Sequence, residues 1–320
     1  MTPRVSVVVA SYNYGRYIAE ALASIQKQTF EDWEAIVVDD GSTDDSLAII
    51  GHFLTDRRFR LVCNPHLGQP QTKNCGILAS SGGFIAFLDA DDRWASGKLD
   101  RQVSLFDKQP KVGVCYTRRQ LIDGGGHLIA GDGRPFHRGQ VLDAIFRDNF
   151  VCFSSAMVRR SFLEQVGLFD ERLALGIDYE LWLRLARVCK FDYIDEPLVQ
   201  YRTGHANLSQ RLAERLDSAI AVMHRFCRDI DLPAQLSPAA RRQAFAETFR
   251  HRALIARRTS TWKAIGWSMR SLAISPFAPL TWLALLGSLV PISLRRTVRN
   301  WRGKHDWEVV TNASRGSIAA

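Results

Sequence analysis

Short apolar runs alternate with segments of helical spacing over the first ninety residues, and this alternation limits the fold more than any other feature. Strands are predicted over 4–10, 33–38, 60–63 and 84–88, and the helices between them over 17–26, 44–54 and 71–80. Strands that alternate with helices predict a parallel sheet with helices on both faces. Because right-handed crossovers bring the carboxyl ends of such strands to one edge, we expect ligands to bind at that edge.

The pattern is less regular after Trp94. We predict helices over 98–106, 162–166, 179–188 and 212–227, a strand over 112–116, a glycine-rich loop over 123–133, a linker over 233–238 and one basic helical stretch over 239–263. In the first half, Ser42 or Thr43 is the expected cap of the helix that begins at Asp44, since hydroxyl side chains accept hydrogen bonds from the free N–H groups of a helix start.

Two acidic clusters fall at the predicted ligand edge. Asp39 and Asp40 end the second strand, and Asp89, Asp91 and Asp92 follow the fourth. Carboxylates gathered at one edge repel one another unless a cation lies among them, and a D-x-D turn suits oxygen ligation of Mg²⁺ or Mn²⁺. Such an ion can bridge two phosphates and stabilise a diphosphate leaving group. The alternative is that these acids only cap helices and shape turns.

Several motifs follow one another in a fixed order between about residue 3 and residue 209. They are VSVVVASYN at 5–13, QTF at 28–30, VDDGSTD at 38–44, NCGI at 74–77, GFIAF at 83–87 and LDADD at 88–92. In this order and spacing they resemble the inverting family 2 glycosyltransferases, of the cell-surface-polysaccharide type. The resemblance implies an α/β GT-A fold, which is Rossmann-like with a mostly parallel central sheet. It also implies transfer of a sugar, with inversion, from a UDP- or dTDP-linked donor to an acceptor hydroxyl, with Mg²⁺ or Mn²⁺.

The resemblance implies a role for individual residues at the donor site. Those expected at the nucleotide-sugar are Ala10, Ser11, Tyr12, Asp39, Asp40, Lys73 and Asp89. Asp40 matches the carboxylate that accepts a hydrogen bond from the pyrimidine N3–H, and Lys73 stands where the family often has Arg. Asp91 matches the metal ligand, and Asp89, the acid near the ribose, is a second candidate ligand. Asp92 is expected to be structural or to face the acceptor.

An inverting transfer needs a carboxylate that removes the acceptor proton. Residues 167–173 and 177–185 resemble the acceptor signature of the family, and Asp178 takes the position of its catalytic base, with Ile177 in place of the usual Glu. The structural alternative is that Asp178 caps the helix, and Glu180 is the competing carboxylate.

Three further features bear on this half of the site. Residues 201–205 resemble a Y-R-x-H element with one extra residue, which makes His205 a candidate third metal ligand, although a lone loop histidine is more often solvated. Ser154 and Ser155 are expected on a loop that faces the donor sugar or the acceptor. Trp94 and Trp182 can stack on sugars, although Trp182 has the spacing of a packed residue.

Positive charge is concentrated near the C-terminus. Residues 241–304 hold thirteen Lys and Arg against one acid, a net charge of +12 in a chain of net charge +9. Aromatic residues and an uncharged stretch, 271–294, accompany them, which favours a segment that lies on an anionic membrane surface. A membrane span, a buried hairpin and a dimer contact are the alternatives. The segment lacks a nucleic-acid-binding module, so no nucleic-acid partner is expected.

These features predict four parts and a location. Residues 1–98 are the donor half and 99–209 the acceptor half of the GT-A domain, 210–263 form a helical extension, and 264–320 form a membrane-associating segment and tail. Six cysteines without paired spacing, and no signal peptide, indicate a cytoplasmic protein, peripheral at the inner face of the plasma membrane. We expect a saccharide acceptor, lipid-linked or polysaccharide.

The sequence excludes two other classes of protein, dinucleotide-dependent oxidoreductases and phospho-acceptor signalling domains, and leaves one alternative. Residues 11–15 lack the glycines of a dinucleotide-binding turn, and a phospho-acceptor signalling domain would end near residue 125. The remaining alternative is a non-catalytic protein that binds nucleotide-sugars or polyanions on the same fold.

Overall fold

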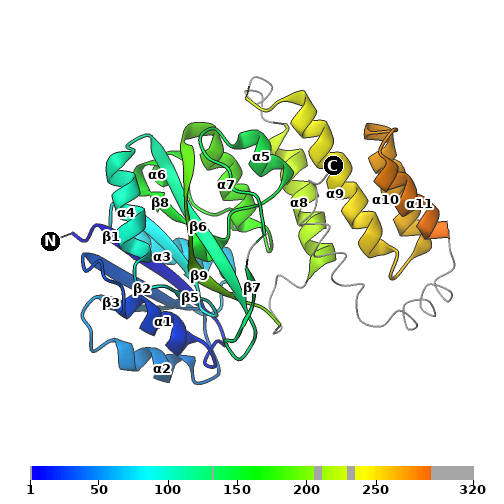
Figure 1. Cartoon of the computed structure of the whole chain (residues 1–320). Coiled ribbons are helices and arrows are strands. Elements are labelled where there is room, and N and C mark those ends of the chain that lie inside the picture. The colour runs from blue at the N-terminus through cyan, green and yellow to red at the C-terminus, as the bar shows by residue number, and fades with distance from the viewer. Residues whose placement is uncertain (1, 132, 205–210, 229–234, 290–320) are drawn as a thin grey trace. The chain divides into compact units, whose positions relative to one another are not determined.

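The computed structural model describes residues 2–131, 133–204, 211–228 and 235–289. The chain divides into two compact units, coloured along the chain in Figure 1. The sheet unit holds most of residues 1–207, and the helical unit holds the chain from residue 208 together with the short pieces 133–135 and 146–148.

A mixed sheet forms the centre of the sheet unit. Its strand order is β3-β2-β1-β4-β8-β6-β9-β5, and β7 lies beside β6. The strands are β1 (Val5–Ser11), β2 (Trp33–Asp39), β3 (Phe59–Cys63), β4 (Phe84–Asp89), β5 (Arg93–Trp94), β6 (Val112–Ile122), β7 (Leu128–Gly131), β8 (Met157–Arg159) and β9 (Lys190–Arg202). The first four strands pair in parallel, as predicted. β8 then runs antiparallel between β4 and β6, whereas β6 and β9 are parallel.

Helices cover both faces of the parallel part (Figure 1). The helices of the sheet unit are α1 (Ile18–Gln26), α2 (Ser46–Phe53), α3 (Gln69–Ala79), α4 (Lys98–Lys108), α5 (Leu142–Arg147), α6 (Arg160–Val166) and α7 (Ile177–Val188), with a 3₁₀ turn, η1, at Phe153–Ser155. On one face, Val7 of β1 packs in a core with Leu22 of α1 and Val103 of α4. On the other face α3 lies so close that a Cβ on Gly76 would be 2.5 Å from Cγ1 of Val8. Only glycine permits this approach.

The structure corrects three predicted boundaries in the sheet unit. α2 begins at Ser46 and neither Ser42 nor Thr43 caps it, because the Ser42 hydroxyl donates to Asp39 instead. The predicted loop 123–133 contains β7, which pairs antiparallel with β6. The Asp123 carboxylate accepts the N–H of Gly125 at 2.8 Å and so stabilises a tight turn between the two strands. The glycine content of this segment had predicted an irregular loop. β6 also continues to Ile122 instead of ending at Tyr116.

The helical unit contains α8 (Leu212–Phe226), α9 (Pro238–Ala256), α10 (Thr261–Ile274) and α11 (Pro279–Leu289). α9 contacts the other three. The predicted continuous stretch 239–263 is wrong, since α9 ends at Ala256 and Ser260 caps α10 by accepting the N–H of Lys263. Residues 233 and 234 of the predicted linker lie outside the described residues, as does His205, and its last residue, Pro238, already belongs to α9. Within the described residues, no helix has both the length and the apolar character that crossing a membrane requires.

Candidate functional site

The carboxyl ends of β1, β2 and β4 bring the first sequence-predicted residues together. Ser11 pairs with Asp39 across β1 and β2, and Ala10 pairs with Asp89 across β1 and β4. Ser11 is buried, and its hydroxyl has no hydrogen-bond partner among the described residues. A buried polar atom without a partner is uncommon in folded proteins. This edge of the sheet therefore lies where ligands of such sheets bind, and the Ser11 hydroxyl can form a hydrogen bond with a polar ligand there.

The two acids that end β2 have different partners. Asp39 is buried, and its carboxylate accepts the backbone N–H of Ser42 at 2.8 Å together with the Ser42 hydroxyl. Asp40 accepts the N–H groups of Leu67 and Gly68, at 2.7 and 2.9 Å, one on each carboxylate oxygen. Since each carboxylate oxygen has a second lone pair, both acids keep acceptor capacity. Asp39 binds within its own turn, whereas Asp40 joins the end of β2 to the segment before α3.

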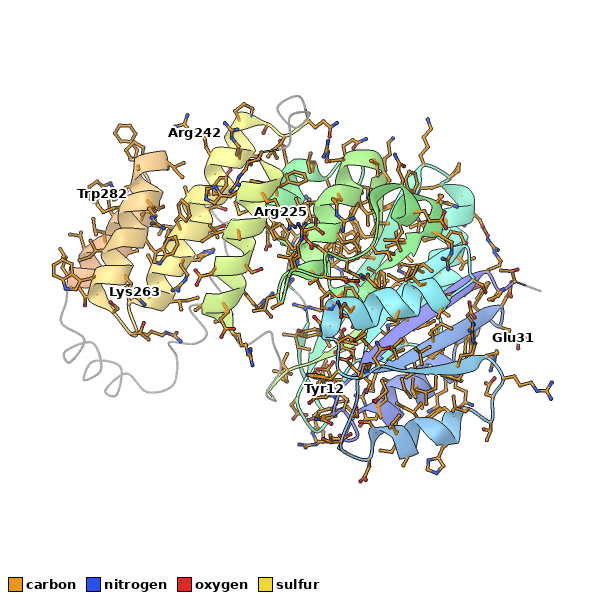
Figure 2. The ribbon with its side chains drawn as sticks, turned by 180° about the vertical axis from the view of Figure 1, so that it is seen from behind. Tyr12, Glu31, Arg225, Arg242, Lys263 and Trp282 are labelled. Atoms are coloured by element: carbon orange, nitrogen blue, oxygen red, sulfur yellow. The ribbon has the colours of Figure 1, made fainter. Side chains whose placement is uncertain are left out.

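Tyr12 lies against a histidine that the sequence analysis did not select. The rings of Tyr12 and His66 are 4.1 Å apart between centroids, and Tyr12 is 40% exposed on this edge, where Figure 2 labels it. His66 has a positive φ of 60° and its Nδ1 is 3.3 Å from Oδ2 of Asp40. A non-glycine residue at positive φ is uncommon and marks a backbone held by its surroundings. The Tyr12–His66 pair thus presents an aromatic surface beside the Asp40 carboxylate.

Gly41 allows this arrangement. Its φ is 78°, and a Cβ there would lie 3.1 Å from the backbone nitrogen of His66. The segment NPHLG at 64–68 is the only sequence signal for His66, because a proline followed by a glycine indicates a turn and says nothing about what the turn contacts.

The turn at the end of β4, the DADD turn, consists of residues 89–92. Nζ of Lys73, from α3, lies 2.9 Å from Oδ1 of Asp89 and 3.5 Å from the centre of the Phe153 ring. Burial raises the pKa of Asp89, the ammonium of Lys73 opposes that rise, and the charges of Asp91 and Asp178 add to it. Lys73 and Asp89 are therefore brought together as predicted for one site, and Asp178 lies close enough to affect it electrostatically.

Asp92 holds the DADD turn from within. Its carboxylate accepts the hydroxyl of Ser154 and, at 2.8 Å, the backbone N–H of Arg202. Burial and the charges of Asp91 and Asp89 raise the pKa of Asp92 well above its ordinary value. Of the two roles predicted for Asp92, these contacts support the structural one.

Arg202 has a larger part than the sequence suggested. It is 1% exposed, and its guanidinium donates to the carbonyl oxygen of Asp91 at 2.8 Å and to the carboxylate of Glu20 at 2.7 Å. Arg202 belongs to the segment that resembles a Y-R-x-H element, but the role predicted from this segment was metal binding by His205, which lies outside the described part of the chain.

The predicted roles of two serines in the ligand site are wrong. Ser154 and Ser155 are fully buried behind the DADD turn and do not face a ligand. The hydroxyl of Ser154 accepts the N–H of Asp89 at 3.1 Å, and that of Ser155 donates to the carbonyl of Cys152. A serine pair is common in loops, so only the tertiary structure distinguishes the two roles.

The two candidate sugar-stacking tryptophans are both buried. Trp94 donates from its indole nitrogen to the carbonyl of Ser154 at 2.7 Å. Trp182 is fully buried in the core, as its spacing predicted.

Asp178 lies in the first turn of α7 and does not cap it. The capping residue is Gly176, at φ 72°, and Oδ2 of Asp178 accepts a hydrogen bond of 2.8 Å from the side-chain amide of Asn149. The competing acid, Glu180, forms an ion pair of 2.8 Å with Arg184, which also donates to backbone carbonyls at 166–168. Glu180 is therefore part of the structural framework, and Asp178 is the α7 carboxylate whose charge affects Asp89. Asn149 had no distinguishing signal in the sequence.

The donor set of the DADD turn suits a hard divalent cation. Asp89 and Asp91 both bring carboxylate oxygens, and the charge of Asp91 adds to the rise that burial causes in the pKa of Asp89. Mg²⁺ binds in proteins through one or two carboxylates, with phosphates and waters as its other ligands. Among the described residues no group of three His, Cys, Asp or Glu side chains is arranged to hold a metal ion. The two acids thus fit a site that a diphosphate would complete.

The profile of glycosyl transferase family 2 matches residues 6–167, which is half of the chain. This chain belongs to glycosyl transferase family 2. The family 2 assignment agrees with an uncharacterized glycosyltransferase of Nostoc sp., 32% identical over 218 residues, which cover 64% of this chain and 66% of that protein. The E. coli chondroitin synthase is 29% identical over 197 residues, or 61% of this chain and 28% of the synthase. This family 2 chain therefore spans less than two thirds of each relative.

Solved structures agree on the fold. S. aureus TarS 1–349, in complex with UDP-GlcNAc, superposes with a TM-score of 0.64 at 18% identity, covering 94% of this chain and 92% of TarS. The mannosyltransferase PcManGT from Pyrobaculum calidifontis, in complex with GDP-Man and Mn²⁺, gives a TM-score of 0.62 at 19% identity, with 98% and 87% covered. The predicted family, its glycosyltransferase class and the GT-A fold of this family 2 chain are confirmed.

Proposed function

We propose that the chain transfers a sugar from a nucleotide-diphosphate donor to an acceptor hydroxyl, with inversion at the anomeric carbon. The observation that carries the proposal is that Asp178, oriented by Asn149 at the start of α7, lies within electrostatic reach of Asp89 in the DADD turn. An acid at the leaving-group site and a second acid from α7 are what a single displacement needs on opposite sides of the reacting carbon. Residues 1–98 would serve mainly the donor and 99–209 mainly the acceptor.

The donor's nucleotide would bind at the Tyr12–His66 pair and Asp40. A base can stack on the exposed Tyr12 ring, and a ring N–H can donate to the remaining lone pair of an Asp40 oxygen. A pyrimidine N3–H has this donor, which supports a UDP- or dTDP-linked sugar, and the UDP-GlcNAc complex of TarS is in keeping with it. Ala10 and Ser11 would line the pocket beneath, and Asp39 would keep its turn in shape.

The donor's diphosphate would meet a cation and Lys73. Mg²⁺ or Mn²⁺, held by Asp91 with Asp89, would supply positive charge to the diphosphate as it leaves. The Mn²⁺ complex of PcManGT supports this choice of metal. Lys73 is held by Asp89 at 2.9 Å and can add a second positive charge near the phosphates. His205 stays a predicted third ligand outside the described residues.

Asp178 would act as the general base. Asn149 donates to Oδ2 of Asp178, which leaves Oδ1 as the oxygen to receive the acceptor proton and fixes the orientation of the carboxylate. A carboxylate held by one such contact is oriented before the acceptor arrives, which is the requirement for efficient proton transfer.

For the acceptor we propose a saccharide, lipid-linked or within a polysaccharide. The similarity to a chondroitin synthase supports the polysaccharide. We place the protein in the cytoplasm, at the inner face of the plasma membrane, and its six free cysteines are in keeping with a reducing compartment.

The deciding experiment measures donor turnover with a panel of UDP-, dTDP- and GDP-linked sugars and oligosaccharide acceptors, with Mn²⁺ and with EDTA. We expect metal-dependent transfer from one donor and a product whose anomeric configuration, determined by NMR, is opposite to that of the donor. Retention would contradict the single displacement. Tight donor binding without turnover on any acceptor would favour the non-catalytic alternative.

A further inference from the structure

The last helix of the helical unit carries its large apolar side chains outward. In α11 the buried side consists of Thr281, Ala284 and Ser288. The exposed large side chains of the same helix are Leu280, Trp282, Leu283, Leu286 and Leu289. A helix that faces water has the opposite arrangement, with its leucines toward the core. This helix therefore exposes the face that a water-soluble helix would bury.

α10 and the turn after it follow the same pattern. The buried residues of α10 are Ala264, Ser268, Ser271 and Leu272, three of them small. Trp262 is 81% exposed, and Phe277, between α10 and α11, is 93% exposed. The Ser271 hydroxyl donates to the carbonyl of Ala246 in α9 at 2.7 Å, so small and hydroxyl side chains hold the three helices together. Figure 2 labels Lys263 on α10 and Trp282 on α11.

The charge of these helices is almost entirely positive. Residues 238–289 contain eight Lys and Arg and a single acid, Glu247, for a net charge of +7. Lys263 and Arg270 are exposed on α10, next in sequence to the exposed Trp262 and Met269. Basic residues interleaved with exposed aromatic and aliphatic ones are the composition of helices that lie in the interface of an anionic membrane.

A cavity of about 550 Å³ lies between the start of α9 and the turn from α10 to α11. Arg242 and Arg250 line it from α9, and Ala278 and Leu280 line it from the other side. Glu247 also lines the cavity, but it is paired with Arg147 at 3.6 Å and accepts from Gln243 at 2.9 Å. Two arginines above an apolar wall match a phosphate that carries a hydrocarbon chain. Leu280 belongs both to this wall and to the exposed apolar set.

We propose that the helical unit docks on an anionic lipid bilayer, with Trp262, Phe277 and the outward leucines of α11 in the acyl-headgroup boundary. Arg242 and Arg250 take the phosphate of a lipid headgroup. A second copy of the chain fits this face less well, because two surfaces of the same positive charge repel each other. A bilayer that contains anionic lipid offers the apolar region and the opposite charge together.

The test uses the full chain and sedimentation with vesicles, either of phosphatidylcholine alone or of phosphatidylcholine mixed with phosphatidylglycerol. We expect binding to the mixed vesicles that high salt weakens but does not abolish. Phe277→Ser with Leu283→Ser should lower the partition coefficient at least about tenfold, because burial of each apolar side chain raises the partition coefficient by about a factor of ten. Lys263→Glu with Arg270→Glu should remove most of the salt-sensitive part.

The sheet unit offers a matched control. Leu128 and Ile129 of β7 are 62% and 55% exposed, so Leu128→Ser with Ile129→Ser removes a similar apolar area elsewhere and should leave vesicle binding unchanged. Thermal unfolding by circular dichroism checks that each variant folds. Lipids with brominated acyl chains provide a second measurement on the chain that keeps Phe277 and Leu283. The bromine atoms should quench part of the tryptophan fluorescence. The quenching should be smaller in Trp262→Phe with Trp282→Phe.

Three outcomes would overturn the proposal. The first is a wild-type chain that binds neither vesicle, and the second is binding that Phe277→Ser with Leu283→Ser leaves unchanged. The third is a dimer, seen by sedimentation velocity without lipid, that these substitutions dissociate while vesicle binding is absent. In that case the face belongs to a second copy.

Discussion

The side-chain amide of Asn149 donates a hydrogen bond of 2.8 Å to Oδ2 of Asp178, and the two residues come from different parts of the chain. Asp178 stands in the first turn of α7, and Asn149 follows α5. This contact orients the carboxylate that we propose as the general base, and it leads to two predictions that separate chemistry from positioning.

Asp178→Asn should lower the transfer rate by about 10² to 10⁴, the usual contribution of a general base. Donor affinity, measured by calorimetry with the nucleotide-sugar and Mn²⁺, should change little, because the amide has the same shape and lies in α7. Glu180→Gln is an informative comparison, since it breaks the ion pair with Arg184 and should reduce thermal stability more than it reduces chemistry. A parallel loss of donor affinity in Asp178→Asn would make this residue a donor ligand.

Asn149→Ala should lower kcat about tenfold and leave the KM for the donor unchanged, because the carboxylate loses one orienting contact and keeps its charge. The measurement is a steady-state comparison in which donor and acceptor are varied separately. Equal losses in donor affinity and kcat would show that Asn149 supports the fold of the site and not the orientation of Asp178.

Asp91→Asn tests the metal site. In the wild type, Mn²⁺ together with the nucleoside diphosphate should raise the melting temperature, since a ligand that binds only the folded state stabilises it. The variant should lose this shift and its turnover while melting normally without metal. The exposed Glu164→Gln on α6, which also removes one negative charge, is the matched control and should keep both. Full turnover in EDTA would exclude a catalytic metal.

Tyr12→Ala should weaken donor binding about 5- to 150-fold, because stacking of a base on an aromatic ring contributes about 1–3 kcal/mol. Tyr12→Phe keeps the ring against His66 and should bind the donor nearly as the wild type does. Both dissociation constants can be measured by fluorescence or calorimetry. If Phe costs as much affinity as Ala, the hydroxyl of Tyr12 and not its ring holds the nucleotide.

Lys98 gives the stability of the chain a predictable dependence on pH. The ammonium is fully buried, 2.7 Å from Oε1 of Gln102 and over the ring of Trp94, and burial lowers its pKa from 10.5 to about 7. Between these two values the unfolded chain binds a proton that the folded chain does not, so stability rises with pH across this window. The slope is at most about 1.4 kcal/mol per pH unit.

Lys98→Met removes this proton from both states. The difference in free energy of unfolding between Lys98→Met and the wild type should shift in favour of the wild type as pH rises from 7 toward 10. Urea titrations at several pH values measure it. Lys108→Met at the end of α4, where the lysine is exposed, provides the control and should show no such trend. A pH-independent difference at position 98 would contradict the lowered pKa.

The parts of the site that the sequence predicted are those that depend on local pattern. Asp40, Asp89 and Asp91 were selected because they belong to acidic clusters at the ends of predicted parallel strands and match motifs of the family, and topology then places strand ends together. His66, Asn149 and Arg202 were missed or misjudged because their contacts join residues 26, 29 and 110 positions apart. No local pattern carries that information.

The fold shows the same division. β1, β2 and β4 are apolar runs that the sequence pattern detects, whereas β8 has three residues and β9 contains acids and a proline. Such strands form because neighbouring strands need a partner, so they follow from tertiary structure and not from their own propensity. The break between α9 and α10 depends on the cap at Ser260, which a helical stretch of basic residues conceals.

The contacts of Arg202 have a consequence for the order in which the protein can assemble during synthesis. The acids of the DADD turn leave the ribosome early, but the backbone N–H and the guanidinium that hold Asp92 and the carbonyl of Asp91 belong to a residue more than a hundred positions later. A nascent chain that ends before β9 therefore lacks one of the hydrogen bonds to the Asp92 carboxylate and the guanidinium contact to the carbonyl of Asp91. The DADD turn therefore gains its full set of hydrogen bonds only when β9 has been translated.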